Sequence, residues 1–223
     1  MHHENKMEEQ AGELLGDAHR LIAQRMTEMT SYVATWYRYQ ALWDVDMAHV
    51  AARLSTDLSQ WQVLLAEVRK ARLTFDVSDS SKAFGFAKID FEQIQWKVTV
   101  KYDQWAKDLL AQFASLFAEV CTAFFQQLQT SRSALEAFGG WDTMAIPELV
   151  QTMATLQRLT EQSAPDEQRI EDMRQVTRLL TRYRYAFPKD WLDFDQIHGE
   201  WEALRSLLAL RNRTLNQQWG TFC

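Results

Sequence analysis

The sequence predicts an all-α fold of elongated antiparallel helical bundles that share a long central helix. Its 223 residues include only 7 Gly and 3 Pro, which favours long uninterrupted helices over a sheet protein with many turns. Apolar residues also recur at steps of three and four over most of the chain, which is the period of an amphipathic helix. Nine Trp and 12 Phe predict a core rich in aromatic side chains.

The N-terminal part divides into a polar leader and a first set of helices. We interpret residues 1–10 as a leader, and His2 and His3 as the remnant of an expression tag, not as a metal site. Residues 11–74 are expected to form the N-terminal helices of the first bundle. The apolar stripe at their start comprises Leu14, Leu15, Leu21, Ile22, Met26, Met29, Val33, Trp36, Tyr37 and Leu42.

Capping residues predict where the next helices begin, because a side-chain oxygen at the N-cap accepts a free backbone N–H of the first turn. Asp46 is expected to cap a short helix, and Ser55 or Thr56 to cap the following one. Residues 75–89 are rich in Asp, Ser and Gly, so we predict a loop there.

A long central helix is expected over residues 90–138, with Asp90 and Gln93 in a capping-box arrangement at its start. Its apolar stripe advances by fours and threes, and extra apolar residues such as Leu110, Phe117 and Cys121 widen it. A face this wide is typical of a helix packed against two or more neighbours. At 1.5 Å per residue the helix would be roughly 70 Å long.

Residues 147–223 are expected to form the C-terminal helices of a second bundle. Gly139–Gly140 can end the central helix, and Pro147 suits the first position of the next one. Pro165 indicates either a break or a kink, because proline cannot donate the helix hydrogen bond. Beyond it, we predict two further helices, over about 166–186 and 194–219.

Composition and motifs exclude several functional classes. The formal net charge is −6 and the isoelectric point about 5.4, which makes nucleic acid a poor partner hypothesis. No apolar run approaches the ~20 residues that span a bilayer, so we expect no membrane insertion. No glycine-rich phosphate loop is present. Cys121 and Cys223 cannot form a disulfide framework, and Cys121 is interpreted as a small buried apolar residue.

The stretch YAFPKDWLDFDQIHGEW, at 185–201, concentrates the candidate chemistry. Asp195 and Glu200 could pair as carboxylates near His198, but residues five apart on a helix point about 140° apart. We therefore interpret the stretch as a joint. Its expected parts are a Pro stop, a helix cap at Asp193 or Asp195, close packing allowed by Gly199, and corner packing by Trp191 and Trp201. Asp193 with Gln196 would form a capping box.

Two surface features allow alternative interpretations. Arg174, Arg178 and Arg182 form a basic strip that could bind an acidic partner, although a solvated face is the commoner explanation. Trp36 and its aromatic neighbours Tyr37, Tyr39 and Trp43 could form an exposed patch for a partner, but Trp36, Tyr39 and Trp43 share helical spacing, which favours core packing.

Four segments together resemble the tail of a dynein heavy chain, most closely the cytoplasmic type. They read YQALWD at 39–44, ARLSTDLSQWQVLLAEVRKARLTFDVSDSSKAFG at 52–85, VKYDQWAKDLLAQF at 100–113, and FPKDWLDFDQIHGEWEALRSLL at 187–208. None is a catalytic signature. Pro165 departs from the resemblance, since members of this family tend to continue as helix there.

The resemblance implies a non-catalytic, rigid helical-bundle rod in the C-terminal part of the tail, which links the cargo-binding tail to the microtubule motor. It implies no cofactor, no metal and no ATPase activity, and a cytoplasmic, cytoskeleton-associated location. The partner it implies is the rest of the heavy chain, and the alternative function is docking of an accessory chain, of dynactin or of a second tail in an autoinhibited state. The joint residues it implies are Phe84, Gly85, Tyr102, Trp105, Phe187, Pro188, Trp191, Gly199, Glu200 and Trp201, to which we add Asp195 as a helix cap.

Overall fold

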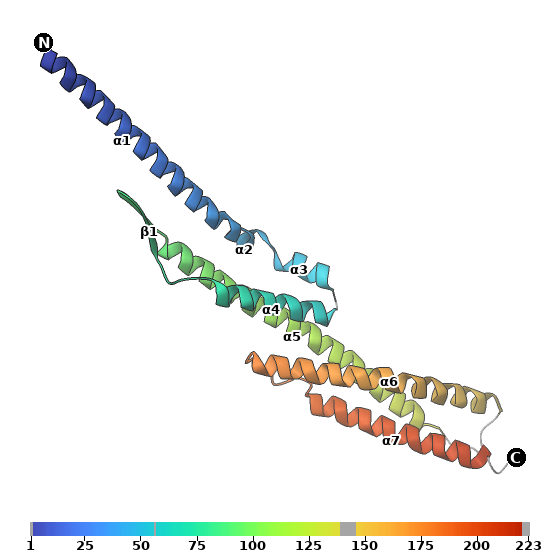
Figure 1. Cartoon of the computed structure of the whole chain (residues 1–223). Coiled ribbons are helices and arrows are strands. Elements are labelled where there is room, and N and C mark those ends of the chain that lie inside the picture. The colour runs from blue at the N-terminus through green and yellow to red at the C-terminus, as the bar shows by residue number, and fades with distance from the viewer. Residues whose placement is uncertain (1, 56, 139–145, 220–223) are drawn as a thin grey trace. The chain divides into compact units, whose positions relative to one another are not determined.

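The computed structural model describes residues 2–55, 57–138 and 146–219. It confirms the all-α prediction, since helices make up most of the described chain and its strands form one two-stranded sheet (Figure 1). The chain divides into two compact units, residues 1–109 and 110–223. The division falls within α5 (Glu92–Glu136), so this helix contributes residues to both units. The predicted central helix over 90–138 is thus confirmed to within two residues at each end.

The first unit begins with α1 (His2–Ala34), followed by η1 (Thr35–Tyr39) and α2 (Ala41–Asp44). Residues 2–10, interpreted as a leader, are helical and continue into the rest of α1. The polar composition that suggested a leader is equally compatible with a helix, because Glu, Gln, Lys and Met all have good helix propensity.

The next two helices, α3 (Met47–Leu54) and α4 (Leu58–Thr74), are both capped by aspartate. Asp46 accepts the backbone N–H of Ala48 at 3.3 Å, which confirms the predicted cap. The cap of α4 was predicted one or two residues too early. Asp57 accepts the N–H groups of Ser59 and Gln60, whereas Ser55 has a positive φ of 48° and Thr56 lies outside the described residues.

The loop expected over 75–89 contains a β-hairpin. Strands β1 (Ser81–Phe84) and β2 (Ala87–Asp90) pair antiparallel, with Ser81 opposite Asp90 and Phe84 opposite Ala87. Gly85 occupies the first turn position with φ 71°, as a two-residue type II′ turn requires. The loop prediction is wrong here because strands of four residues show too little alternation to reveal themselves beside Ser- and Asp-rich turns.

The core of the first unit is aromatic. Its side chains with less than a tenth of their surface exposed come from α4, the hairpin region and α5: Trp61, Leu65, Phe75, Phe84, Phe91, Val98 and Leu109. The ring of Trp36 lies 5.2 Å from that of Phe91, and the ring of Tyr39 lies 5.2 Å from that of Phe75. Trp36 and Tyr39 thus pack against this core but are only half-buried, whereas Trp43 is 44% exposed and Tyr37 is 71% exposed.

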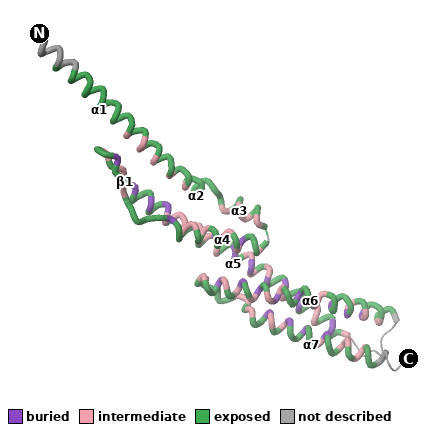
Figure 2. Tube along the Cα trace, viewed as in Figure 1, coloured by how far each residue is buried: buried purple, intermediate pink, exposed green. Residues whose placement is uncertain are grey.

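The apolar stripe of α1 is largely exposed. Leu14 and Leu15 are 70% and 66% exposed, and Met26 is 61% exposed. Figure 2 shows most of α1 in the colour of exposed residues. Periodicity predicted the stripe correctly, but it does not indicate whether a neighbouring helix covers it.

The second unit consists of α5 from Leu110 onward, α6 (Ile146–Arg182) and α7 (Phe194–Trp219), with α6 and α7 side by side (Figure 1). Its apolar core residues include Phe113, Phe117, Cys121, Phe124, Leu128 and Leu135 from α5, Leu156, Ile170, Met173, Val176 and Leu180 from α6, and Ile197, Trp201, Leu204 and Leu208 from α7. The wide apolar face of the central helix therefore packs against two neighbouring helices, as predicted. Gly139–Gly140, expected to end that helix, lie outside the described residues.

Pro165 lies inside α6. The prediction of a separate helix starting near 166 is wrong, because α6 is assigned as one helix from Ile146 to Arg182. Pro165 lacks the N–H that would donate to the carbonyl of Glu161. Buried Leu159 before it and buried Ile170 after it keep both halves packed, and this packing outweighs the single missing hydrogen bond.

One helix of the described chain, α5, is long and apolar enough to cross a membrane if length and composition alone are considered. Polar residues are interspersed among the apolar ones of α5, so no uninterrupted apolar run marks it in the sequence. Leu109, Phe113 and Phe124 of this helix are fully buried, and a core helix of a bundle meets the same length and composition criteria.

Candidate functional site at the turn between α6 and α7

The turn begins where α6 ends in a left-handed residue. The N–H of Arg184 donates to the carbonyl of Thr181 at 2.9 Å, and the N–H of Tyr185 donates to the carbonyl of Leu180 at 3.0 Å. This is the Schellman pattern, which normally places Gly at the left-handed position. Here Arg184 occupies it with φ 55°. The predicted Pro stop is therefore wrong, since α6 ends six residues before Pro188.

Aromatic rings fill the turn. The ring of Trp191 lies 5.9 Å from Tyr185, 5.0 Å from Phe187 and 6.2 Å from Phe117 of α5. Trp191 thereby connects the turn to the core of the second unit. Phe187 remains 37% exposed, and Pro188 is exposed as well. Ring contacts of this kind stabilise a fixed path of the chain, because tilted and edge-on arrangements are preferred geometries.

The start of α7 follows part of the predicted capping box. Asp193 precedes the helix, and its backbone N–H donates to the side-chain oxygen of Gln196 at 3.1 Å. Asp195 does not hold the cap position. It is an exposed residue in the first turn, where a negative charge interacts favourably with the helix dipole.

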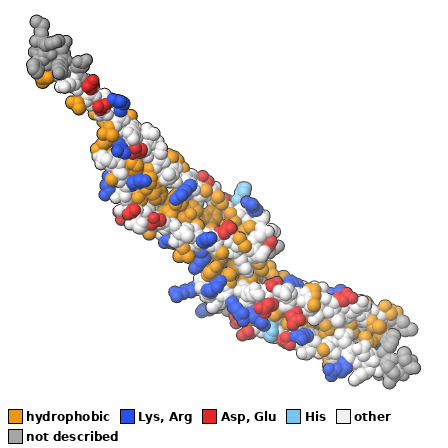
Figure 3. All heavy atoms as spheres, in the orientation of Figure 1, with side chains coloured by type: hydrophobic (Ala, Val, Ile, Leu, Met, Phe, Trp, Pro, Cys, Tyr) orange, Lys and Arg blue, Asp and Glu red, His pale blue; other side chains and the backbone are white. Residues whose placement is uncertain are grey.

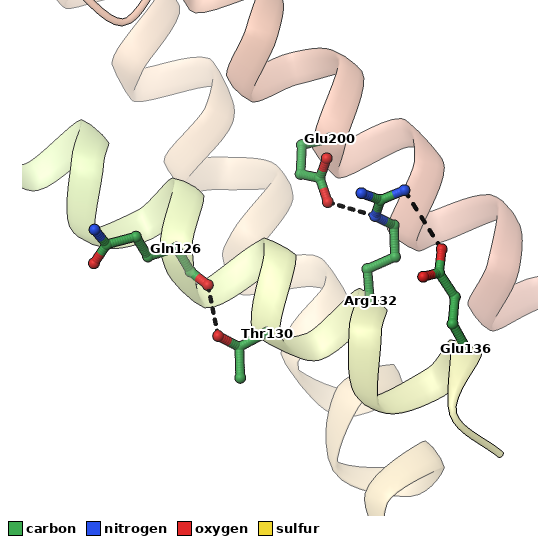
Figure 4. A network of polar contacts seen from close by, with 5 residues as sticks. All are labelled: Gln126, Thr130, Arg132, Glu136 and Glu200. Atoms are coloured by element: carbon green, nitrogen blue, oxygen red, sulfur yellow. Dashed lines mark hydrogen bonds and ion pairs between the residues drawn. The ribbon is translucent and has the colours of Figure 1, made fainter.

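Glu200 makes an ion pair that the sequence did not reveal. Its carboxylate accepts a hydrogen bond from Nε of Arg132 on α5 at 2.6 Å, and only 11% of its side chain is exposed. Arg132 also lies 3.4 Å from Glu136 (Figure 4). The two partners are 68 residues apart in sequence, so no local pattern indicates the pair. Glu200 is therefore ion-paired with Arg132 and does not form a carboxylate pair with Asp195.

Trp201 and Gly199, two other residues of the stretch, differ in burial. Trp201 is 4% exposed and belongs to the core. Gly199, expected to allow a bulky neighbour to pack close, is exposed, and a Cβ built on it meets no atom within 4 Å. That expectation is wrong, since nothing approaches the residue closely enough to require glycine.

The remaining predicted joint residues belong to the first unit, where they occupy two places. Phe84 is buried at the hairpin and Gly85 forms its turn. On α5, the ring of Tyr102 lies 6.2 Å from Phe75, and the indole N–H of Trp105 donates to the carbonyl of Leu42 at 2.8 Å. Phe84, Tyr102 and Trp105 thus make packing contacts within that unit, whereas Gly85 is exposed at the hairpin turn.

Two buried groups have shifted pKa values. Burial raises the pKa of the Cys121 thiol to about 12, so the thiol is protonated at neutral pH and is not a nucleophile. Burial also raises the pKa of Asp166, although the charge of Arg169, 3.7 Å away, lowers it in part. Asp166 Oδ1 has no hydrogen-bond partner among the described residues. The sequence did not indicate that this carboxyl group is buried, because Asp166 and Glu167 directly follow Pro165, as acidic residues at a helix start do.

The histidines stay apart from other possible ligands. The ring of His198 lies 5.8 Å from that of Phe194, and His49 is exposed on α3. Over the residues that the structure describes, no group of three or more His, Cys, Asp or Glu side chains could hold a metal ion. Packed helices, an aromatic turn and a partly exposed ion pair thus characterise this all-α segment.

Comparison with known proteins shows which family this segment belongs to. No protein-family model matches the chain. It is 36% identical over 203 residues to the cytoplasmic dynein heavy chain of Dictyostelium discoideum, in an alignment that covers 91% of this chain and 4% of that protein. It is 33% identical over 207 residues to the cytoplasmic dynein heavy chain of Drosophila melanogaster, and 36% over 197 residues to that of Neurospora crassa, which cover 93% and 88% of this chain.

The chain belongs to the dynein heavy chain family. It spans about 4% of the length of the curated relatives it matches, so it corresponds to one segment of those proteins. The resemblance inferred from four short segments of sequence is therefore confirmed.

Proposed function

We propose that this chain is a non-catalytic segment of the tail of a cytoplasmic dynein heavy chain, where it acts as a stiff helical spacer between the cargo-binding part of the tail and the microtubule motor. The observation that supports this most is α5, which is unbroken over 45 residues. At 1.5 Å per residue such a helix is about 68 Å long. It is packed by α6 and α7 in the second unit, and packed helices resist bending better than an isolated one.

A spacer of this kind has an expected location and an expected partner. It would lie in the cytoplasm in association with the cytoskeleton, and its constant partner would be the rest of the heavy chain. ATP hydrolysis would reside elsewhere in the motor. The purified chain should therefore show no ATPase activity, and hydrolysis lost on a fold-preserving point mutation would contradict the proposal.

Small-angle X-ray scattering tests the spacer role on the isolated chain. A compact globule of 223 residues has a radius of gyration of about 17 Å. A spacer must be extended, so we expect a clearly larger value. A value near that of the globule would refute the proposal.

A replacement experiment in a complete heavy chain tests stiffness as the function. The segment is exchanged either for an unrelated helical bundle of similar length or for a Gly/Ser linker with the same number of residues, which behaves as a flexible coil. A spacer predicts that the bundle preserves motility and the linker does not. Loss of motility with both replacements would show that the sequence of the segment matters beyond its stiffness.

Docking is the second candidate function, and the exposed apolar side chains of α1 favour it. Leu14, Leu15 and Met26 are each more than 60% exposed, and exposed apolar patches often mark interaction surfaces. The partners would be accessory chains, dynactin or a second tail in an autoinhibited state. Pull-down with accessory subunits tests this candidate. If no interaction is found at micromolar concentration, the docking function is rejected and the spacer function is favoured.

A further inference from the structure

The C-terminal end of α6 and the turn after it carry a concentrated positive charge. Residues 173–189 contain five Lys and Arg and no Asp or Glu, in a chain whose net charge is −6. Four of these cations are exposed, and Figure 3 shows Lys and Arg side chains gathered over this end of α6. We define the basic surface as Arg178, Arg182, Arg184 and Lys189.

No carboxylate of the described chain neutralises the basic surface. Among the described residues, none of its four cations lies within 4 Å of an Asp or Glu oxygen, whereas the neighbouring Arg174 pairs with Glu171 at 2.8 Å. Asp190 is exposed beside Lys189 and is the nearest acidic residue in sequence. The surface therefore keeps a net positive charge.

The helix dipole explains only part of this charge. Cations near a helix C-terminus are favourable, but the effect fades beyond the last turn. Arg182 lies in the last turn of α6, whereas Arg178 lies one turn earlier. Arg184 is beyond the helix in a left-handed conformation that glycine would adopt without strain. An arginine at that position is disfavoured for folding, which points to a use for its charge.

We propose that the basic surface binds an extended acidic segment of a partner polypeptide. Arg178 and Arg182 are four residues apart on one helix face, a rise of about 6 Å. Alternate side chains of an extended peptide are about 6.6 Å apart on one face, so alternate carboxylates can meet both guanidinium groups. The partly exposed ring of Phe187 next to the surface offers an apolar contact. A polypeptide fits better than nucleic acid, since the rest of this acidic chain repels a long polyanion.

Fluorescence anisotropy on the full 223-residue chain tests the proposal. The probe is a fluorescein-labelled peptide with six alternating Glu and Ser pairs. The test variant is R178E/R182E, and the matched control is R158E/R213E, which reverses two exposed arginines of the same unit that have no ion pair among the described residues. We expect at least tenfold weaker binding to R178E/R182E, because each attraction becomes a repulsion, and a less than twofold change in the control.

Arg184→Gly separates binding from folding. Glycine removes the side-chain charge and relieves the left-handed conformation, so we expect a higher melting temperature together with weaker peptide binding. A residue with a purely structural role would not change the two quantities in opposite directions. Circular dichroism must show that R178E/R182E melts within a few degrees of the wild type, and R178Q/R182Q takes its place if it does not.

Four outcomes would overturn the proposal. These are no binding of the peptide at low salt, equal weakening in the test and control variants, unchanged binding by Arg184→Gly, and tighter binding of a dT12 oligonucleotide or of phosphatidylserine vesicles at the same surface. This proposal does not depend on the spacer role, because the isolated chain can bind the peptide whether or not it stiffens the tail.

Discussion

Replacing Trp201 by alanine tests the packing of the second unit most directly. Trp201 is 4% exposed, and its neighbours along the same face of α7, Ile197 and Leu204, are 1% and 3% exposed. Truncation removes nearly the whole indole from a site that cannot collapse easily, so the expected loss is about 3–5 kcal/mol of unfolding free energy. For a chain of this size, that corresponds to a drop of about 10 °C in melting temperature.

Urea unfolding followed by far-ultraviolet circular dichroism measures this loss, and the chain supplies its own control. Trp96 on α5 is 65% exposed, so Trp96→Ala should change the unfolding free energy by less than about 0.5 kcal/mol. If Trp201→Ala is as mild as the control, Trp201 is not a core residue and the packing described for α7 is wrong. Equal, large losses in both variants would show that burial does not determine the cost.

Three further substitutions test individual contacts. Pro165→Ala should stabilise the chain by up to about 3 kcal/mol, as measured by urea unfolding, and a loss instead would mean that the packing of α6 needs the proline. Asp166→Asn should raise the melting temperature at pH 7. Because burial raises the pKa of this carboxyl group, its ionised form destabilises the folded state and its protonated form does not. The increase in melting temperature should therefore vanish as the pH falls below the ordinary Asp pKa of 3.8. An increase that persists at low pH would refute the reasoning. Trp105→Phe should cost about 1–2 kcal/mol, because the carbonyl of Leu42 loses its indole donor, and an unchanged urea midpoint would show that water replaces the donor.

Features set by neighbouring residues, such as helix caps and the period of an apolar stripe, could be predicted from the sequence. The Asp46 cap followed from capping chemistry, and the extent of α5 followed from its apolar stripe to within two residues at each end. The end of α6 did not follow, because sequence pointed to Pro188 while the chain turns earlier through a left-handed Arg184, a conformation that residue type alone argues against.

Long-range packing decided the features that the sequence left open. Continuity of α6 through Pro165 depends on buried residues on both sides of it. The ion pair of Glu200 depends on Arg132, 68 positions away. The apolar stripe of α1 is visible in the sequence, but its exposure is a property of what surrounds the helix. Of the candidate site, the aromatic and capping residues were therefore predictable, and their partners were not.

The hairpin affects the tendency of the chain to aggregate at high concentration. A two-stranded sheet has two outer edges with unpaired backbone groups, and such edges can recruit a strand from another molecule. Here each strand has only four residues, and Lys82 and Lys88 place a charge on both strands. Short, charged edges resist accretion of further strands. The mostly helical chain therefore includes a sheet without providing a template for fibril growth.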